Sequence, residues 1–305
     1  MNSMILIKMK GRKLQLILCL AAAMALVCGC GKNPADDEKM QLERELSAKC
    51  EDTTLSAQQR AQSCIDWVKL TEHTILHLDH LGLTEVPDTI GQVTTLKLLH
   101  INNNRLKDLP PSIANLQHLE FLSLYNNSFT EFPEVVCRLE NLRRLYFWNN
   151  KLENLSESIG NLNKLYELSL HHNRLKHLPE SIGKLDQLTE LSLFENQLKS
   201  LPESIGNMRQ LSLLNVANNR LASLPESIGN LKALYVLNVA WNKINKLPAS
   251  MANLVNLQHF YAGHNRLTNL PEAWCNNKGL FITMDDNPLT EKVFNSKCKK
   301  AMRKK

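Results

Sequence analysis

The chain has 305 residues, of which 43% are hydrophobic and 22% are charged. This is the composition of a folded protein, and it excludes a chain that is disordered throughout. The formal net charge is +6, but 11 of the 36 Lys and Arg residues lie in segments 8–13 and 292–305. The rest of the chain carries 25 basic against 30 acidic residues, so we predict no nucleic-acid binding.

The first 29 residues have the layout of a secretory signal. A positively charged patch at residues 8–13 precedes an apolar run over 14–27, and the small-residue pair Cys28-Gly29 follows. An apolar run of this length is too short to span a bilayer comfortably. We therefore predict a signal peptide over residues 1–29.

The end of this signal, VCGC followed by GKNPADDE, resembles a bacterial lipobox. The resemblance implies that Cys30 is the first mature residue and carries several acyl chains, which together give durable membrane attachment. It also implies an exported protein, lipid-anchored at the bacterial outer membrane or cell surface. A plain cleaved signal and an uncleaved anchor are the alternatives. Polar residues continue to about residue 40, so residues 30–40 are predicted to be the lipid anchor and a tether.

Asparagine recurs every 23 residues through most of the chain. The positions are Asn104, Asn127, Asn150, Asn173, Asn196, Asn219, Asn242 and Asn265. A strict period in this range indicates a stacked solenoid, in which each repeat buries its apolar side chains against its neighbours. A buried amide offers donors and an acceptor, so we expect each Asn to bond backbone groups of its own coil and the next.

Each repeat has the form LxxLxLxxNxLxxLPxxIgnLxx. The first part alternates apolar and polar residues, as a strand does, and the LPxxIgnL part predicts a turn and a short 3₁₀ or irregular segment. The pattern resembles the leucine-rich repeat family, in its 23-residue LPxxIG type, over residues 73–289. The resemblance implies an α/β solenoid: a horseshoe with a parallel concave β-sheet, short convex segments and about ten copies.

Both ends of the array depart from the pattern, as terminal repeats do. Leu81 stands at the Asn position of the first copy, and Asn287 comes one residue early in the last. Ser156 replaces the Pro of its copy. Residues 41–72 are expected to form a helical N-terminal cap, and residues 290–305 a basic tail. The tail is predicted to be a solvated, frayed terminus, with contact to anionic lipid as the alternative.

The cysteines fit an oxidising compartment. Cys50 and Cys64 precede the first repeat, whereas Cys275 and Cys298 bracket the last. We predict one disulfide in each pair, with free thiols packed as small hydrophobic residues as the alternative. Cys137 has no obvious partner and is expected in the core.

Residues between the leucines of each strand point away from the core and form columns along the concave face. The column two residues before each Asn contains four successive rings, at Tyr125, Trp148, His171 and Phe194. We predict an exposed ligand-binding patch there. Its residues are Tyr125, Arg144, Tyr146, Trp148, His171, Phe194 and Glu195. Exposed rings with a polar rim are typical of a binding site, but rings that stack along a sheet also stabilise it.

No catalytic motif is found: the chain lacks HExxH, CxxC, GxSxG and a phosphate-binding Gly loop. Adjacent His171 and His172 diverge on a strand, so no metal and no cofactor are predicted. We expect a non-enzymatic, monomeric envelope lipoprotein that binds a protein or peptide and meets the membrane through its lipid. One alternative is a surface-displayed adhesin or structural envelope protein. Another is an intracellular signalling scaffold, because LPxxIG repeats also resemble eukaryotic proteins that bind small GTPases.

Overall fold

The computed structural model describes residues 34–276, 279–289 and 294. The chain consists of two compact units, Met1–Glu45 and Leu46–Lys305. The predicted signal peptide, Cys30 and Cys298 lie outside the described residues, as does most of the basic tail. None of the helices in the described part is long and apolar enough to span a bilayer.

The first described element is helix α2 (Pro34–Glu51). It includes residues 34–40, which were expected to form part of an irregular tether. Pro34 lacks the backbone N–H that the first turn of a helix leaves unpaired, so it is compatible with this position.

Helix α3 (Ala57–Thr71) covers the first repeat. Ser56 caps its N-terminus in a capping box with Gln59, and the helix ends at Glu72 in the left-handed conformation. Its apolar side, which includes Ile65 and Val68, is buried in the core of the array. The helical cap predicted before the first repeat is therefore present, and it keeps the first coil's leucines from water.

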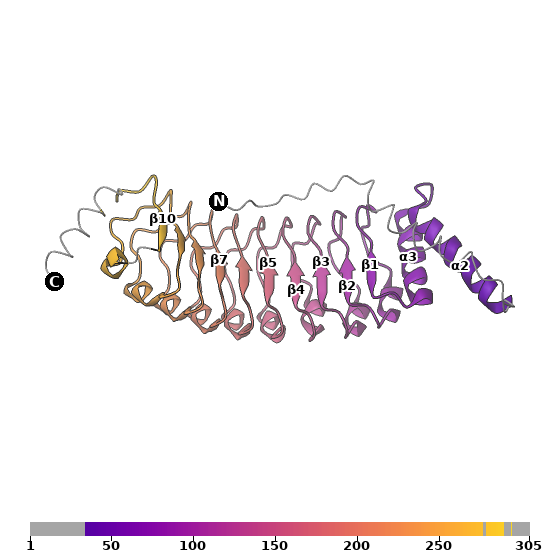
Figure 1. The fold of residues 1–305 in the computed structure, drawn as a ribbon. Helices are drawn as coiled ribbons and strands as arrows, with labels where there is room; N and C mark the ends of the chain where they lie inside the picture. Colours follow the sequence, from indigo (N-terminus) through magenta and orange to yellow (C-terminus); the bar gives the residue numbers. More distant parts are fainter. Residues whose placement is uncertain (1–33, 277–278, 290–293, 295–305) are drawn as a thin grey trace. The chain divides into compact units, whose positions relative to one another are not determined.

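Ten three-residue strands form one parallel sheet in sequence order (Figure 1). They are β1 (Ile75–His77), β2 (Leu98–His100), β3 (Phe121–Ser123), β4 (Arg144–Tyr146), β5 (Glu167–Ser169), β6 (Glu190–Ser192), β7 (Leu213–Asn215), β8 (Val236–Asn238), β9 (His259–Tyr261) and β10 (Phe281–Thr283). Paired residues on adjacent strands up to β9 are 23 apart, as Leu145 and Leu168 are. The period of the sequence is thus the register of the sheet.

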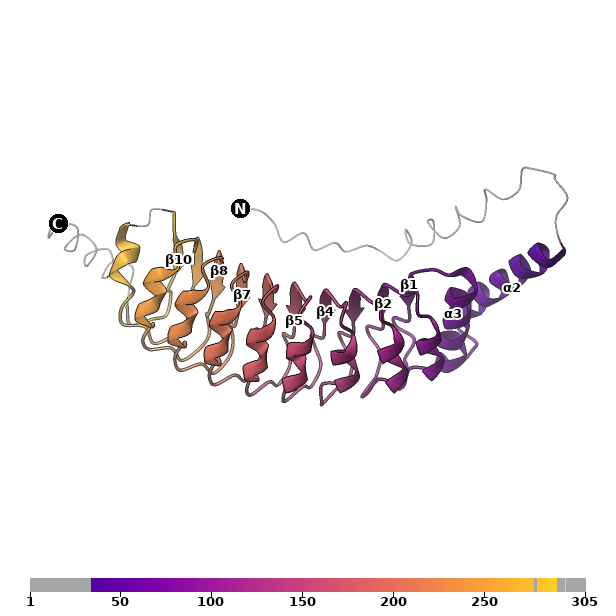
Figure 2. The ribbon, with the colours of Figure 1, turned by 90° about the horizontal axis from the view of Figure 1, so that it is seen from below.

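A 3₁₀ segment follows the Pro of each repeat, or the Ser at position 156. The segments are η2 (Asp88–Gln92), η3 (Pro111–Asn115), η4 (Glu134–Arg138), η5 (Glu157–Asn161), η6 (Glu180–Lys184), η7 (Glu203–Asn207), η8 (Glu226–Asn230), η9 (Ala249–Asn253) and η10 (Glu272–Asn276). Within the repeat unit, the strands lie along the inner side of an arc and the 3₁₀ segments along its outer side (Figure 2). The predicted repeat solenoid is confirmed.

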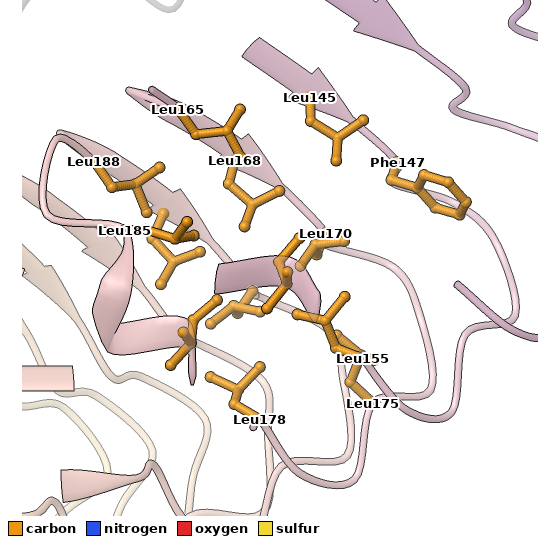
Figure 3. Packing of buried hydrophobic residues seen from close by; sticks show 14 of the residues in the cluster. Leu145, Phe147, Leu155, Leu165, Leu168, Leu170, Leu175, Leu178, Leu185 and Leu188 are labelled. Carbon is orange, nitrogen blue, oxygen red and sulfur yellow. The ribbon is translucent and has the colours of Figure 1, made fainter. Parts of the chain in front are cut away.

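The core fills the space between the sheet and the 3₁₀ segments. Leu168 and Leu170 come from a strand and its end, Leu175 and Leu178 from the following turn, and Leu185 from the end of η6. All are buried and pack against the same positions of neighbouring coils (Figure 3). Truncating one buried Leu to Ala in a packed core lowers the free energy of unfolding by about 2–5 kcal/mol. Because each of these leucines packs against neighbouring coils, the stability of one coil depends on the coils beside it.

The asparagine ladder satisfies backbone groups between the coils. The Asn173 amide donates to the carbonyls of Leu170 at 3.1 Å and Phe147 at 3.0 Å, and its oxygen accepts from the Leu152 N–H at 3.0 Å. The same pattern recurs at Asn104, Asn127, Asn150, Asn196, Asn219, Asn242, Asn265 and Asn287. The structural role is confirmed, but the neighbouring coil is the preceding one and not the next.

Carboxylates connect the outer segments in the opposite direction. Glu157 accepts a hydrogen bond from the Ser181 N–H of the next coil at 3.1 Å, and Glu180, Glu203 and Glu226 repeat this contact with Ser204, Ser227 and Ser250. Hydrogen bonds from the backbone and side chain of Ser250 lower the pKa of Glu226.

The Gly of the repeat allows this close approach of the outer segments. A Cβ on Gly183 would collide with the Ser204 carbonyl oxygen of the next coil. Where Ser156 replaces Pro, its hydroxyl accepts from the Ser158 N–H and caps η5. The substitution therefore leaves the turn intact.

Replacing Asn173 with Ala should lower the free energy of unfolding by about 3 kcal/mol or more, because several buried backbone groups lose their partner. Urea unfolding monitored by circular dichroism measures this loss. Asn154→Ala is the matched control, since Asn154 is exposed, and it should change stability by less than about 0.5 kcal/mol. Equal effects of the two substitutions would contradict the structural role of the ladder.

Candidate ligand-binding face

Four columns of side chains form the inner surface of the arc. Because side chains alternate along a strand, the buried leucines three and five residues before each Asn leave positions two, four and six on the opposite side. The position one before each Asn lies at the strand end. We call these four columns the concave face. The sequence interpretation used only three of them and missed the column six before each Asn. That column contains Ile75, Leu98, Phe121, Arg144, Glu167, Glu190, Leu213, Val236, His259 and Phe281.

Tyr125, Trp148, His171 and Phe194 form one continuous ring stack. Successive ring centroids are 4.1, 5.1 and 4.4 Å apart, and the interplanar angles are 5°, 10° and 10°. The rings were expected to be exposed, but all four are half-buried. Each inner ring is sandwiched between its two neighbours, so the stack presents mainly ring edges to solvent.

Tyr146 and Arg144 lie outside the ring column, in the columns four and six residues before each Asn. The Arg144 guanidinium lies over the Phe121 ring at 4.8 Å, and Tyr146 meets the same ring edge to face at 5.1 Å. Burial, with a hydrogen bond to Glu167, raises the pKa of Tyr146 to about 12. The structure therefore separates these two predicted site residues from the ring stack.

The acidic residues of the concave face occupy two different settings. Glu167 and Glu190 are directly paired across β5 and β6, an arrangement of like charges that destabilises a sheet. Burial and the Glu167 charge raise the pKa of Glu190. Glu195, by contrast, lies in the column one before Asn and bonds His172 at 2.5 Å. Glu167 has Arg144 opposite it on β4, whereas Glu190 faces Glu167 on β5 and Leu213 on β7. Glu190 is therefore the carboxylate with no basic residue directly opposite it, and neither Glu was among the predicted site residues.

The residue before each ladder Asn adopts a left-handed backbone. Positive φ occurs at His80, Asn103, Asn126, Asn149, His172, Glu195, Asn218, Trp241, His264 and Asp286. Asn, Asp and His are enriched in this conformation, whereas bulky side chains there are outliers. In the first half of the array the Asn side chains bond one another, as Asn126 and Asn149 do at 2.9 Å. Trp241 and Glu195 depart from this preference.

Trp241 is the most exposed ring among the described aromatic residues of the concave face, at 57% of its accessible area. It has φ 58° and stacks on His264 with centroids 3.6 Å apart, and His264 bonds Asp286 at 2.9 Å. A strained position that exposes a large ring is an indication of function. The sequence signal was available: Trp stands where the other copies have Asn, His, Glu or Asp.

Beyond Phe194 the ring column continues as Ala217, Ala240 and Gly263. No ring in this column therefore covers the outer face of Phe194. We call these three positions the small-residue lane. It follows the ring stack along the sheet, and the Trp241 position directly succeeds Ala240 in the chain.

The predicted disulfides remain predictions. Cys50 and Cys64 are thiols that hydrogen-bond each other, and this contact together with burial raises the pKa of Cys50. Cys298, the expected partner of Cys275, lies outside the described residues. Cys137 is buried, as predicted, and burial followed by the nearby Glu134 raises its pKa to about 12.

Burial, and then the charge of His172, lower the pKa of His171 to about 4. The unfolded chain, with a His pKa near 6.5, binds this proton more readily. Stability from a neutral His171 is therefore complete above about pH 6.5 and is lost as pH falls towards 4. His171→Phe should keep the stack and flatten this part of the stability profile. Urea midpoints of both proteins between pH 7.5 and 4.5 measure the difference, and parallel profiles would refute it.

Two family models match the repeat array. The model described as "Leucine-rich repeat region" matches residues 67–174, and that described as "Leucine rich repeat" matches residues 163–221 and 209–267. No curated protein matches the chain.

Solved structures give the same result. A leucine-rich repeat protein of Leptospira interrogans is 31% identical, with a TM-score of 0.60, over 68% of this chain and 59% of its own. The ectodomain of the Arabidopsis thaliana receptor kinase GASSHO1/SCHENGEN3, bound to CASPARIAN STRIP INTEGRITY FACTOR 2, is 28% identical, with a TM-score of 0.65, over 75% and 28%. An internalin of Listeria monocytogenes, at 19% identity, TM-score 0.58 and 68% and 66% coverage, shares the fold. The chain thus spans less than two thirds of the length of the first two. It belongs to the leucine-rich repeat family.

Proposed function

We propose that this protein is a non-enzymatic, lipid-anchored envelope protein that binds a protein or peptide along its concave face. The observation that carries the proposal is Trp241, a large exposed ring in a left-handed backbone position. Trp241 stacks on His264, but 57% of its area stays exposed and its left-handed backbone disfavours a bulky side chain. Trp is also the residue type most enriched among those that dominate binding energies.

The ring stack and the small-residue lane divide the concave face into two parts. In the stack, neighbouring rings cover one another, so these residues contribute to stability more than to contact with a partner. In the lane, the side chains of Ala217 and Ala240 leave room beside the Phe194 ring. An apolar side chain of a partner fits there, with Trp241 at its side.

Charge favours a basic partner segment. Glu167 and Glu190 lie side by side on β5 and β6, and only Glu167 has a basic residue, Arg144, opposite it on the next strand. Burial, and then the Glu167 charge, raise the pKa of Glu190. A Lys or Arg side chain placed between them would relieve this repulsion. The proposed ligand is therefore an extended segment with a basic and an apolar side chain.

Two structural relatives are in keeping with this proposal. A plant peptide hormone receptor, 27% identical over 66% of this chain, has been solved in complex with RGF2, and the receptor kinase ectodomain has been solved with its own factor. RGF2 and CASPARIAN STRIP INTEGRITY FACTOR 2 are ligands of those two plant receptors and are not assigned to this protein. What carries over is that a repeat array of this family can hold a peptide or protein ligand.

Trp241→Asn separates binding from stability. Asn suits the left-handed backbone, and the equivalent position of the preceding coil is Asn218. The melting temperature of the variant should therefore stay the same or rise. Loss of a central Trp contact should weaken partner binding by about 2 kcal/mol, or roughly 30-fold. Binding is measured by calorimetry with a partner recovered on the mature domain.

Two further variants complete this test. Tyr166→Ala removes an exposed ring outside the four columns and should leave binding unchanged. Trp148→Ala, within the ring stack, should lower the melting temperature instead. Unchanged affinity in Trp241→Asn would refute the proposed site.

The lipid anchor rests on Cys30 and the lipobox resemblance. Metabolic labelling with palmitate should mark the wild-type protein and not the Cys30→Ser variant, whereas Cys28→Ser should remain labelled. Protease treatment of intact cells then distinguishes a periplasmic binding protein, which is protected, from a surface-displayed adhesin, which is digested. Equal labelling of all three proteins would refute the anchor.

A further inference from the structure

Three metal-ligating side chains lie together on the first two strands, apart from the ring stack. His77 ends β1, Asp79 follows two residues later, and His100 ends β2 directly opposite His77. One ligand atom from each of the three lies within 4.8 Å of the others. Because positions two apart on a strand share a face, all three belong to the concave face.

We propose that His77, Asp79 and His100 bind a divalent transition metal ion of the Zn²⁺ type. Two imidazoles and one carboxylate are a donor set that suits zinc and its first-row neighbours. Ligands about 2.0–2.1 Å from a tetrahedral ion lie about 3.3 Å from each other. The His77 Nδ1 and Asp79 Oδ2 atoms are already 3.3 Å apart.

A small rotation of the His77 ring brings it into position to share an ion with His100. The rings of His77 and His100 are stacked, with centroids 4.4 Å apart and an interplanar angle of 19°. The His77 side chain is 56% exposed, so it can rotate without displacing packed neighbours. Such a rotation would shorten the ligand-atom separations, which are all within 4.8 Å, towards the about 3.3 Å of a tetrahedral site.

The carboxylate is held in place by the backbone of the next coil. Asp79 Oδ1 accepts the Asn102 N–H at 2.7 Å, which leaves Oδ2 facing His77. Asn102 is buried and is fixed by hydrogen bonds from the Ser123 hydroxyl at 2.5 Å and the Tyr125 N–H at 3.2 Å. Supporting contacts that orient a ligand in this way strengthen metal sites.

His100 is supported on its other side by apolar contact. Its ring meets Phe121 with centroids 4.9 Å apart, and burial is the main cause that lowers the pKa of His100. A neutral imidazole is the form that binds a metal. Three protein ligands leave a tetrahedral position for water or for a donor from a bound partner.

Isothermal titration of the untagged, full-length protein with Zn²⁺ tests the site. We expect one ion per chain, and a loss of affinity of about tenfold or more in His77→Ala and in His100→Ala. Co²⁺ should give visible absorption bands in the wild type that both variants lose. His118→Ala and His177→Ala, two exposed histidines elsewhere, are the matched controls and should bind like the wild type.

Cys50 and Cys64 interact with each other, and thiols also bind Zn²⁺, so Cys50→Ser is titrated in parallel. Binding that survives in Cys50→Ser and disappears in His77→Ala supports the proposal. Absence of stoichiometric binding in the wild type would overturn it. So would binding that the histidine variants retain, or binding that Cys50→Ser alone abolishes. Circular dichroism of each variant confirms that it is folded, and Asp79→Asn provides a milder second probe of the same site.

Discussion

The buried asparagine amide is the contact on which the rest of this structure depends. A solenoid coil must turn its backbone inside the core, where unpaired N–H and C=O groups are costly. The amide of each ladder Asn supplies donors and an acceptor at that turn, to its own coil and to the preceding one. Only with these groups satisfied can the leucines close into a continuous core. The positions of the strands, and of every column on the concave face, then follow from the Asn.

The concave face is built on this framework in two different ways. In the middle of the array, stacked rings and bonded Asn side chains satisfy one another and leave little free contact area. Towards the C-terminal end, small side chains and the exposed Trp241 leave contact area uncovered. The first two strands, with His77 and His100, form a third and chemically distinct part. A single repeated backbone therefore presents three surfaces that differ only in a few side chains per coil.

The fold could be read from the sequence because the period, the leucines and the Asn residues all act locally and in register. The site could be read only in part. Counting from Asn located Tyr125, Trp148, His171 and Phe194, but the parallel ring planes that half-bury them depend on rotamers, which no pattern encodes. Arg144 was included with the stack because the column six before Asn, which also contains Phe121, was overlooked. Tyr146 lies in the column four before Asn, and the pattern does not show that its ring contacts Phe121. Helix α2 was missed over residues 34–40, where apolar periodicity is absent.

The opposite directions of the two inter-coil contacts make the array polar along its length. Each Asn reaches back to the coil before it, on the inside. In four coils an outer Glu, such as Glu180, reaches forward to the Ser of the coil after it. An end exposed by loss of C-terminal coils would keep its own carboxylate but lose the amide that bonds its turn. An end exposed by loss of N-terminal coils would keep its amide but lose the carboxylate that caps its outer segment. The two ends of such an array are therefore not equivalent, and each needs a different kind of cap.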